Sequence, residues 1–533
     1  MTSSITPPVK ATDAWLRRAF AFAVLAFVWW RMSENTADND LWGHVLYGQR
    51  MLHLGGLETT ETLSWTAAGL PWINHEVLAE LALGLTHRLA GGAGLWALML
   101  ILAGVTVGWA WQSGAGPDRA RRLTALALLA LSANFIALGY AVRPQLFTYL
   151  FLVALLVALR KFFAGRFAWG FLPPILLLVW VNTHGGFLAG WIIVLLAVWV
   201  EFYASLVPAL LQRLRCRPVA PGRFRLLGLA LGSTVALLAN PWGWKMILWT
   251  LGTLMLPRPN IPEWLPMPLT AGNLPFYFTI LLGAAAWFVS RQPRRLWEMI
   301  VWTLLAAMTI KTQRHAPLFG LASLILLPAH LQELFARLAP RVASLRQLAQ
   351  KPAIAAVAAL ALVVAGAKCI QASLSAPRAY PFRMEVPRTF FPVAAIEYMK
   401  THHLTGNTIT FFDWGQQVLW ELPDNPVSFD GRLDTVYPAR VMDAHWALYA
   451  GHDPGPDLDL SKAEVALLPT GGDGYPWLAK HGWKVAYCDA LATVLTHRPV
   501  VGRPGFGSAE DVSGSIPFPD AIPVLATRAA RSK

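Results

Sequence analysis

The chain has 533 residues, of which 55% are hydrophobic and only 14% are charged. Soluble domains carry about 25% charged residues, so this composition argues against a soluble protein and indicates an integral membrane protein. The formal net charge of +14 does not indicate nucleic-acid binding, because the basic residues stand in short clusters between apolar runs, as in cytoplasmic loops. We therefore expect no nucleic acid among the partners.

The first apolar run, residues 19–30, follows Lys10, Arg17 and Arg18. A cleaved signal peptide has a similar charge pattern, but no clear small-x-small cleavage motif follows this run. We expect an uncleaved first membrane helix.

Apolar stretches long enough, or nearly long enough, to span a membrane recur along the first 370 residues. They lie near residues 15–31, 93–111, 121–139, 145–161, 168–182, 186–209, 226–240, 275–290, 296–310, 315–331 and 352–368. Two shorter apolar segments, 77–90 and 244–256, can lie in the membrane interface instead. The fold expected for residues 1–370 is a mainly α polytopic bundle of about eleven transmembrane helices.

The distribution of basic residues favours this count. If both shorter segments are interfacial and the N-terminus is cytoplasmic, most Lys and Arg residues of the membrane region fall in cytoplasmic loops. If segment 77–90 alone spanned the membrane, every later loop would change sides and the bias would collapse. The pattern therefore predicts a multi-pass protein of the cytoplasmic (inner) membrane, with its C-terminal part outside.

Composition changes after the last apolar stretch. Short β-like runs occupy residues 407–412, 426–430, 465–469, 484–488 and 493–497, and helix-like segments at 391–400 and 414–421 separate some of them. This pattern predicts an extracytoplasmic α/β domain over residues 371–500. Residues 501–533 are rich in Gly, Pro, Ser and Ala, which predicts a loose tail. Asp413 and Asp430 each stand at a strand end, where a role in turn geometry is favoured over catalysis.

With this topology, the unusual polar residues gather mostly on the outer side. They are Asp38, Asp40, His44, Asn74, His75 and Glu76 in the first outer loop (32–76), then Arg143, Gln145, Asn182, Thr183, His184, Asn240, Trp242, Lys245, Glu263, Lys311, Gln313, Arg314 and His315 in later turns and loops. Each one alone can simply be solvated. Together they suggest an outward-facing cavity, with carboxylates for chemistry and arginines for an anionic group. Arg143 and Arg314 stand out because they oppose the positive-inside bias.

The first outer loop is the most informative stretch. Asp40 and His44 are four residues apart, so a helix that begins here places both on one face. An acid at a helix start is also an ordinary cap. We favour the capping role for Asp38 and a functional role for Asp40.

At these residues the sequence resembles the GT-C superfamily of membrane glycosyltransferases, and in particular its bacterial mannosyltransferase-like and uncharacterised members. The motifs that carry the resemblance are Asp38-Asn39-Asp40-Leu41-Trp42-Gly43-His44, Thr62-Leu63-Ser64-Trp65-Thr66 and Pro71-Trp72-Ile73-Asn74-His75-Glu76, with weaker echoes at Arg143-Pro144-Gln145, His184-Gly185-Gly186, Glu263-Trp264, Arg314-His315, Asp413-Trp414-Gly415 and Asp430-Gly431-Arg432. The chain departs from the family pattern at Gly43, where a second aromatic residue is usual, and at Leu63, which replaces an Asp-Pro-Phe turn.

The resemblance implies transfer of a sugar from a polyprenyl-phosphate carrier to a glycan, lipid or protein acceptor at the outer membrane face. Asp40 occupies the place of the family's loop carboxylate, which acts as base or positions the acceptor. The leaving phosphate suits Arg143 or Arg314. The full set of candidate substrate-binding residues is Asp38, His44, His75, Glu76, Arg143, His184 and Arg314. His44, His75 and Glu76 can also join Asp40 around a divalent metal ion.

Two other classes of function remain open. A transporter or lipid flippase usually binds its substrate near the membrane midplane on broken helices, whereas the ionisable residues here lie at one edge. A non-catalytic GT-C-like scaffold would be favoured if the outer pocket lacked either a base or an arginine.

Overall fold

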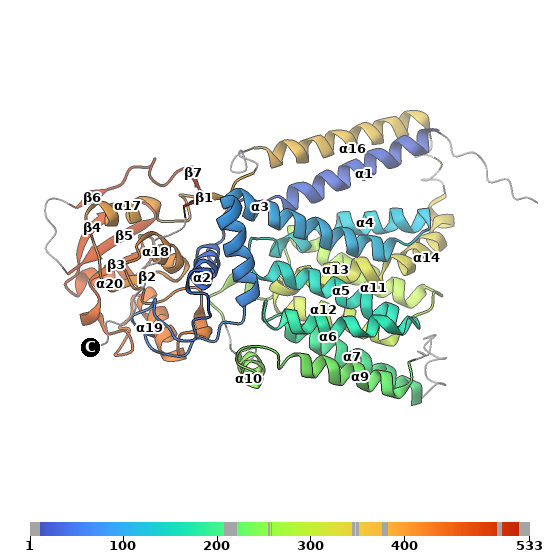
Figure 1. The fold of residues 1–533 in the computed structure, drawn as a ribbon. Coiled ribbons are helices and arrows are strands. Elements are labelled where there is room, and N and C mark those ends of the chain that lie inside the picture. Colours follow the sequence, from blue (N-terminus) through green and yellow to red (C-terminus); the bar gives the residue numbers. More distant parts are fainter. Residues whose placement is uncertain are drawn as a thin grey trace, which may run out of the picture.

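The computed structural model describes residues 11–206, 221–253, 256, 258–343, 347, 351–375, 382–497 and 504–521. It has two parts, a bundle of long helices and a smaller part in which short helices surround strands (Figure 1). The helices of the first part are α1 (Ala11–Met32), α2 (Leu41–Leu54), α3 (Val77–Ala115), α4 (Arg119–Ile136), α5 (Gln145–Phe163), α6 (Leu172–Trp180), α7 (Phe187–Leu206), α9 (Arg223–Ala236), α10 (Trp244–Thr253), α11 (Leu274–Val289), α12 (Leu296–Lys311), α13 (Ala316–Leu326), α14 (Pro328–Leu338) and α16 (Pro352–Ser373).

The bundle is that of a polytopic membrane protein. Among the described residues, six helices are long and apolar enough to cross a membrane, and the number rises to seven if the bent pair α13–α14 forms one span. Each stretch predicted to span overlaps a described helix, although some of these helices, such as α6 and α9, are short. The mainly helical fold is confirmed, and the number of eleven spans stays a prediction.

Helix α3 contains a break that separates a short first segment from a long apolar one. Ala90 and Gly91 have non-helical backbone angles, and Gly91 has a φ of 57°, which glycine adopts readily. In Figure 1 the segment before the break stands almost at right angles to the bundle helices, and α10 is seen nearly end-on. The interfacial placement of segments 77–90 and 244–256 stays a prediction.

The C-terminal part contains a five-stranded sheet in the order β2-β3-β5-β4-β6. Its strands are β2 (Thr408–Thr410), β3 (Val465–Pro469), β4 (Lys484–Cys488), β5 (Ala492–Thr496) and β6 (Gly505–Phe506), and its helices are α17 (Val393–Thr401), α18 (Gly415–Glu421), α19 (Ala439–Tyr449) and α20 (Gly474–Lys480). The β2–β3 and β4–β6 pairs are parallel, whereas β5 pairs antiparallel with β3 and β4. The predicted α/β character of this part is therefore correct.

One predicted strand of this part, residues 426–430, is replaced by bridges between segments far apart in the sequence. Val427 makes isolated bridges with Ser64 of the first outer loop and with Thr408 of β2. The predicted strand is therefore reduced to Val427, whose two bridges tie the first outer loop to the sheet.

The segment expected to be a loose tail is partly ordered. Strand β7 (Ser515–Pro517) pairs antiparallel with β1 (Glu385–Pro387), and Phe518 is only 2% exposed. Residues 522–533 lie outside the described residues. Composition did not reveal this order because the pairing partners lie far away in the sequence.

Helix α2 is packed between the two parts. Trp42, at its start, is fully buried and its ring contacts those of Phe391, Trp420 and Phe518 from the C-terminal part. Such aromatic contacts with several buried rings fix both the position and the rotation of a helix. The first turn of α2 is therefore held by the C-terminal part, called the soluble part below, as well as by the bundle.

Helix α2 also lies unusually close to α3. A Cβ atom on Gly48 would lie 2.0 Å from the backbone oxygen of Glu80, and one on Gly84 would lie 2.7 Å from the backbone of Gly48. The two glycines let the backbones touch, and Gln49 donates a hydrogen bond to the Gly84 carbonyl at 2.8 Å. This contact sets the start of α2 against the start of α3.

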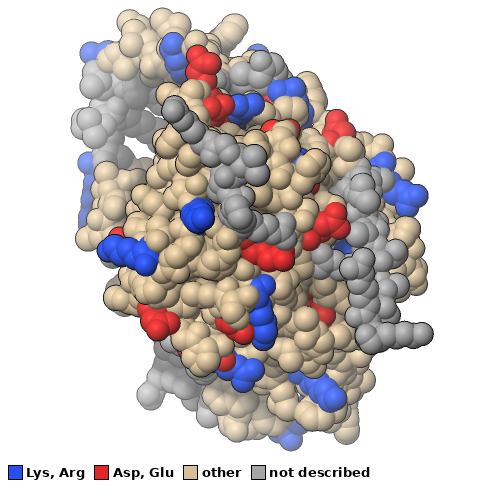
Figure 2. Space-filling model, turned by 90° about the vertical axis from the view of Figure 1, so that its left-hand side faces the viewer, with Lys and Arg blue, Asp and Glu red and all other residues tan. Residues whose placement is uncertain are grey.

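Figure 2 shows the molecule from the side of the soluble part. Acidic and basic side chains are interspersed over this face, and among the described residues visible there neither sign forms a continuous patch.

Candidate active site

The carboxylates of Asp38 and Asp40 have different local partners. The Asp38 side chain accepts a hydrogen bond from the backbone N–H of Asp40 at 3.1 Å, as a turn or capping residue does. Asp40 precedes the first residue of α2, but its side chain makes no capping hydrogen bond. Its carboxylate pairs with Arg143 instead of capping the helix.

Arg143 is the centre of an ion-pair network at the start of α2. Its Nη2 lies 3.2 Å from Asp40 Oδ2, its Nε contacts Asp38, and its Nη1 lies 3.4 Å from Glu263 Oε2. Arg314 pairs with the other oxygen of Glu263. The structure therefore brings Asp38, Asp40, Arg143 and Arg314 together, although they come from three separate segments of the chain.

This network is only partly covered. The side chain of Asp40 is 26% exposed, and those of Arg314 and Glu263 are 28% and 33% exposed. A substrate can therefore reach the carboxylate and the guanidinium groups without local unfolding. Glu263 belongs to the outer polar group noted in the sequence, but no role was predicted for it.

Asp40 has the electrostatic surroundings of a base that works near neutral pH. Burial raises the pKa of Asp40 to about 6, and the charge of Asp38 adds to this rise, whereas the nearby Arg143 opposes it. A general base is most effective when its pKa lies near the working pH. Asp40 is therefore ionised at neutral pH and can still accept a proton.

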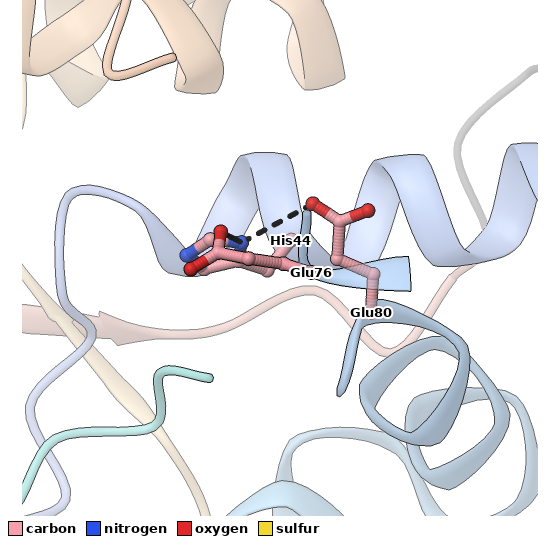
Figure 3. A group of neighbouring side chains, drawn as sticks. All are labelled: His44, Glu76 and Glu80. Atoms are coloured by element: carbon pink, nitrogen blue, oxygen red, sulfur yellow. Dashed lines mark hydrogen bonds and ion pairs between the residues drawn. The ribbon is translucent and has the colours of Figure 1, made fainter. Parts of the chain in front are cut away.

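A second cluster lies one turn further along α2. His44 Nδ1 is 3.5 Å from Glu80 Oε1 and 3.7 Å from Glu76 Oε2, and Figure 3 marks these contacts with dashed lines. The candidate ligand atoms of these three residues all lie within 4.8 Å of one another. Asn74 donates a hydrogen bond to the second oxygen of Glu80 at 2.5 Å.

Sequence reasoning missed Glu80. It lies four residues after Glu76, so the two carboxylates share one face where α3 begins, and this spacing was the available signal. What the spacing does not reveal is the approach of α2, which brings His44 to that face.

One imidazole nitrogen and two carboxylates suit a divalent transition metal such as zinc or manganese. Burial acts to lower the pKa of His44, but the Glu80 hydrogen bond and the charge of Glu76 outweigh it and raise the pKa to about 9. A metal ion would have to displace this proton.

His75 and His184 complete the surroundings of Glu76. His75 Nε2 and His184 Nε2 lie 3.7 and 3.8 Å from Glu76 Oε1. The Gly186 N–H donates to His184 Nδ1 at 2.9 Å, so the His184 proton lies on Nε2 and faces Glu76. Burial, together with the charge of Arg314, lowers the pKa of His184 to about 3, which keeps this ring neutral.

The two aspartates singled out in the C-terminal part have different surroundings. Asp413 stands near the outer site, where burial raises its pKa and a hydrogen bond with Asn39 opposes the rise. Asp430 is fully buried, with its Oδ2 2.7 Å from Arg432 Nη2, and the same guanidinium pairs with Glu61 of the first outer loop. Asp430 therefore belongs to an ion network that joins the two parts.

Comparison with known proteins gives matches at the level of structure alone. No family model matches the chain, and no curated protein sequence matches it. The apo oligosaccharyltransferase of Archaeoglobus fulgidus has a TM-score of 0.56 and 13% identity, over 86% of this chain and 70% of that chain. The archaeal oligosaccharyltransferase AglB of the same organism, bound to an inhibitory peptide and a dolichol-phosphate, has a TM-score of 0.52 and 13% identity over the same shares.

ArnT from Cupriavidus metallidurans in the apo state has a TM-score of 0.52 and 14% identity, over 92% of this chain and 99% of that chain. The chain has the GT-C fold. The Asp40–Arg143 network lies at the start of α2, and the role that the sequence resemblance implies for Asp40 stays a prediction.

Proposed function

We propose that this protein is a membrane glycosyltransferase that moves a sugar from a polyprenyl-phosphate carrier to an acceptor at the outer face of the cytoplasmic membrane. The observation that carries the proposal is the contact of Arg143 with Asp40, with Arg314 joined to the same network through Glu263. A candidate base and two candidate phosphate ligands therefore stand within one accessible cluster.

The proposed reaction divides its tasks between these groups. Asp40 accepts the proton of the acceptor hydroxyl, whose oxygen then bonds to the anomeric carbon of the sugar. The bond between that carbon and the phosphate oxygen breaks, and the polyprenyl phosphate leaves with the electron pair. Arg143 and Arg314 stabilise the charge that grows on the phosphate. Glu263 pairs with both guanidinium groups, so a donor phosphate would compete with it there.

A divalent metal ion fits the proposal at His44, Glu76 and Glu80. Their donor atoms lie within 4.8 Å of one another, and one nitrogen with carboxylate oxygens is a donor set that such ions accept. When bound, the ion would supply positive charge for an anionic or hydroxyl-bearing substrate. The histidines around Glu76 are suited to bind sugar hydroxyls whether or not the ion is present.

Two further observations support catalysis over the alternatives. A non-catalytic scaffold is expected to lack a base or an arginine at the outer site, and this site holds both. Transport is expected to use ionisable groups near the membrane midplane, whereas these groups lie in loops and at helix ends. The bound dolichol-phosphate belongs to AglB, and the shared fold makes a lipid-linked donor reasonable for this chain.

The test is transfer by purified protein in lipid nanodiscs, with a panel of polyprenyl-phosphate sugars as donors and membrane extract as the source of acceptors. Asp40→Asn preserves shape and removes the base, so we expect transfer to fall about 10²–10⁴-fold while donor binding is retained. Asp424→Asn, at an exposed aspartate of the soluble part, is the matched control. Near-wild-type transfer by Asp40→Asn would remove the basis of the proposal.

A further inference from the structure

The soluble part touches the Asp40 carboxylate through a glycine. A Cβ atom on Gly431 would lie 2.3 Å from Asp40 Oδ1 and 2.9 Å from Gln416 Nε2. Real Cβ atoms do not come this close to another atom, so any side chain at position 431 must displace the carboxylate. The backbone of Gly431 is not in the left-handed region, so the requirement for glycine here is one of space.

Gln416, on α18, fills the space between Gly431 and α2. Its side chain is buried, and its Oε1 accepts the backbone N–H of Gly43 at 3.1 Å. A Cβ atom on Gly43 would lie 2.4 Å from this amide group, which explains why the aromatic residue usual in the family is missing there. The Gln416 amide and the Asp40 carboxylate therefore converge on the same face of Gly431.

The loop that carries Gly431 is held firmly on both sides. Its neighbours are Asp430 and Arg432, and Arg432 pairs with Asp430 at 2.7 Å and also with Glu61 of the first outer loop. Tyr437 donates a further hydrogen bond to Asp430 at 3.0 Å. All four side chains of this network are buried. Gly431 is thus a fixed point relative to the start of α2.

We propose that Gly431 and Gln416 are positioning residues for Asp40, so that the soluble part forms one wall of the catalytic centre. This inference rests on the proposed function of Asp40 as the base. Asp40 Oδ2 is held by Arg143 at 3.2 Å, and Oδ1 lies against Gly431, so the two oxygens are restrained from opposite sides. A base restrained in this way presents one orientation to the acceptor hydroxyl, which is the geometric condition for efficient proton transfer.

The first test is Gly431→Ala in the full-length protein in nanodiscs. The added methyl group displaces a flexible carboxylate by roughly an ångström, and a misplacement of this size can cost about 10²-fold in rate. We expect at least a tenfold loss of kcat, with the Kd for polyprenyl phosphate unchanged within about twofold. Gly471→Ala is the matched control, because a Cβ atom there has nothing within 4 Å and position 471 also lies in the soluble part.

The double variant separates positioning from a general structural effect. Asp40→Asn alone leaves residual transfer, and adding Gly431→Ala to it should cause no further loss if the glycine acts only through Asp40. If Gly431→Ala lowers kcat by the same factor in the Asp40→Asn background as in the wild-type protein, the inference is overturned. If Gly431→Ala matches the Gly471→Ala control while Asp40→Asn is impaired, the positioning role is wrong and the proposed function stands. If Asp40→Asn itself is active, the proposed function has failed.

A second variant tests the inference independently if the Gly431→Ala protein does not fold. Gln416→Glu keeps an acceptor oxygen for the Gly43 N–H but replaces the amide NH2 beside Asp40 with a charged oxygen. We expect the same tenfold or greater loss of kcat, again absent in the Asp40→Asn background. Wild-type kcat in a folded Gln416→Glu protein would contradict the proposed role of Gln416.

Discussion

Replacing Arg143 with glutamine should move the acidic limb of the pH–rate profile to higher pH. Burial raises the pKa of Asp40 to about 6, and the positive charge of Arg143 limits that rise. Asp40 must be ionised to accept a proton, so wild-type transfer should rise with pH through about 6 and then level off. Without the guanidinium, Asp38 and Glu263 repel the Asp40 charge with less opposition, and a higher pH is needed to ionise it.

The size of this effect follows from the geometry. An opposite charge within about 4–6 Å lowers the pKa of a carboxyl group by about 1–3 pH units. Arg143 Nη2 lies 3.2 Å from Asp40 Oδ2, and the two side chains are 15% and 26% exposed, so water screens part of the interaction. We therefore expect a shift in the lower half of this range, about 1–2 pH units.

The assay is kcat/KM for transfer as a function of pH, because this quantity reports the ionisation of the free enzyme. Arg143→Gln also weakens donor binding, but a sugar phosphodiester does not titrate in this range. That loss therefore lowers the whole curve without moving its limb. Arg50→Gln is the control, because Arg50 lies on α2, the helix that Asp40 precedes, and pairs with Glu58 at 2.6 Å instead of with Asp40.

The profile can refute the reasoning in two ways. An acidic limb at the same pH in Arg143→Gln and wild type would show that Arg143 does not set the ionisation of the base. A limb that survives unchanged in Asp40→Asn would show that another group titrates. His44 also faces Asp40 across one helical turn, so a limb that moves in His44→Gln but not in Arg143→Gln would assign the control of ionisation to that residue.

Three further predictions test the rest of the structure. Arg432→Met leaves the buried carboxylates of Glu61 and Asp430 without their partner, so it should destabilise the protein by about 3–5 kcal/mol, measured by thermal unfolding in detergent. His44→Ala should reduce the zinc or manganese content of purified protein, measured by elemental analysis, and equal content in both proteins would remove the proposed ion site. A reporter fused after Lys533 should signal the extracytoplasmic side, and a cytoplasmic signal would reverse the predicted topology.

Several features of the molecule could be predicted from the sequence because they depend on local properties. The apolar stretches predict helices such as α5 and α16, since hydropathy over some twenty residues is enough to indicate a membrane helix. Short β-like runs predict β3, β4 and β5 in the same way. The Asp40–His44 spacing places both residues on one helix face before any tertiary contact is known.

The candidate site itself is only partly contained in the sequence. The distribution of Lys and Arg residues between the loops predicts that Asp40, Arg143 and Arg314 share one side of the membrane. It does not predict that Arg143 contacts Asp40 at 3.2 Å. That contact depends on how α2, α5 and the loop before α11 pack, and packing is decided by side-chain shapes that are distant in sequence.

The tertiary structure alone decided the role of the glycines and the soluble part. Gly48 and Gly84 allow α2 to touch α3, and this approach brings His44 to Glu80. Gly431 lies against Asp40 although nearly four hundred residues separate them, roughly the distance in sequence between Gly43 and Gln416. A glycine carries no hydropathy or charge signal, so its function of leaving space becomes visible only when the atoms around it are known.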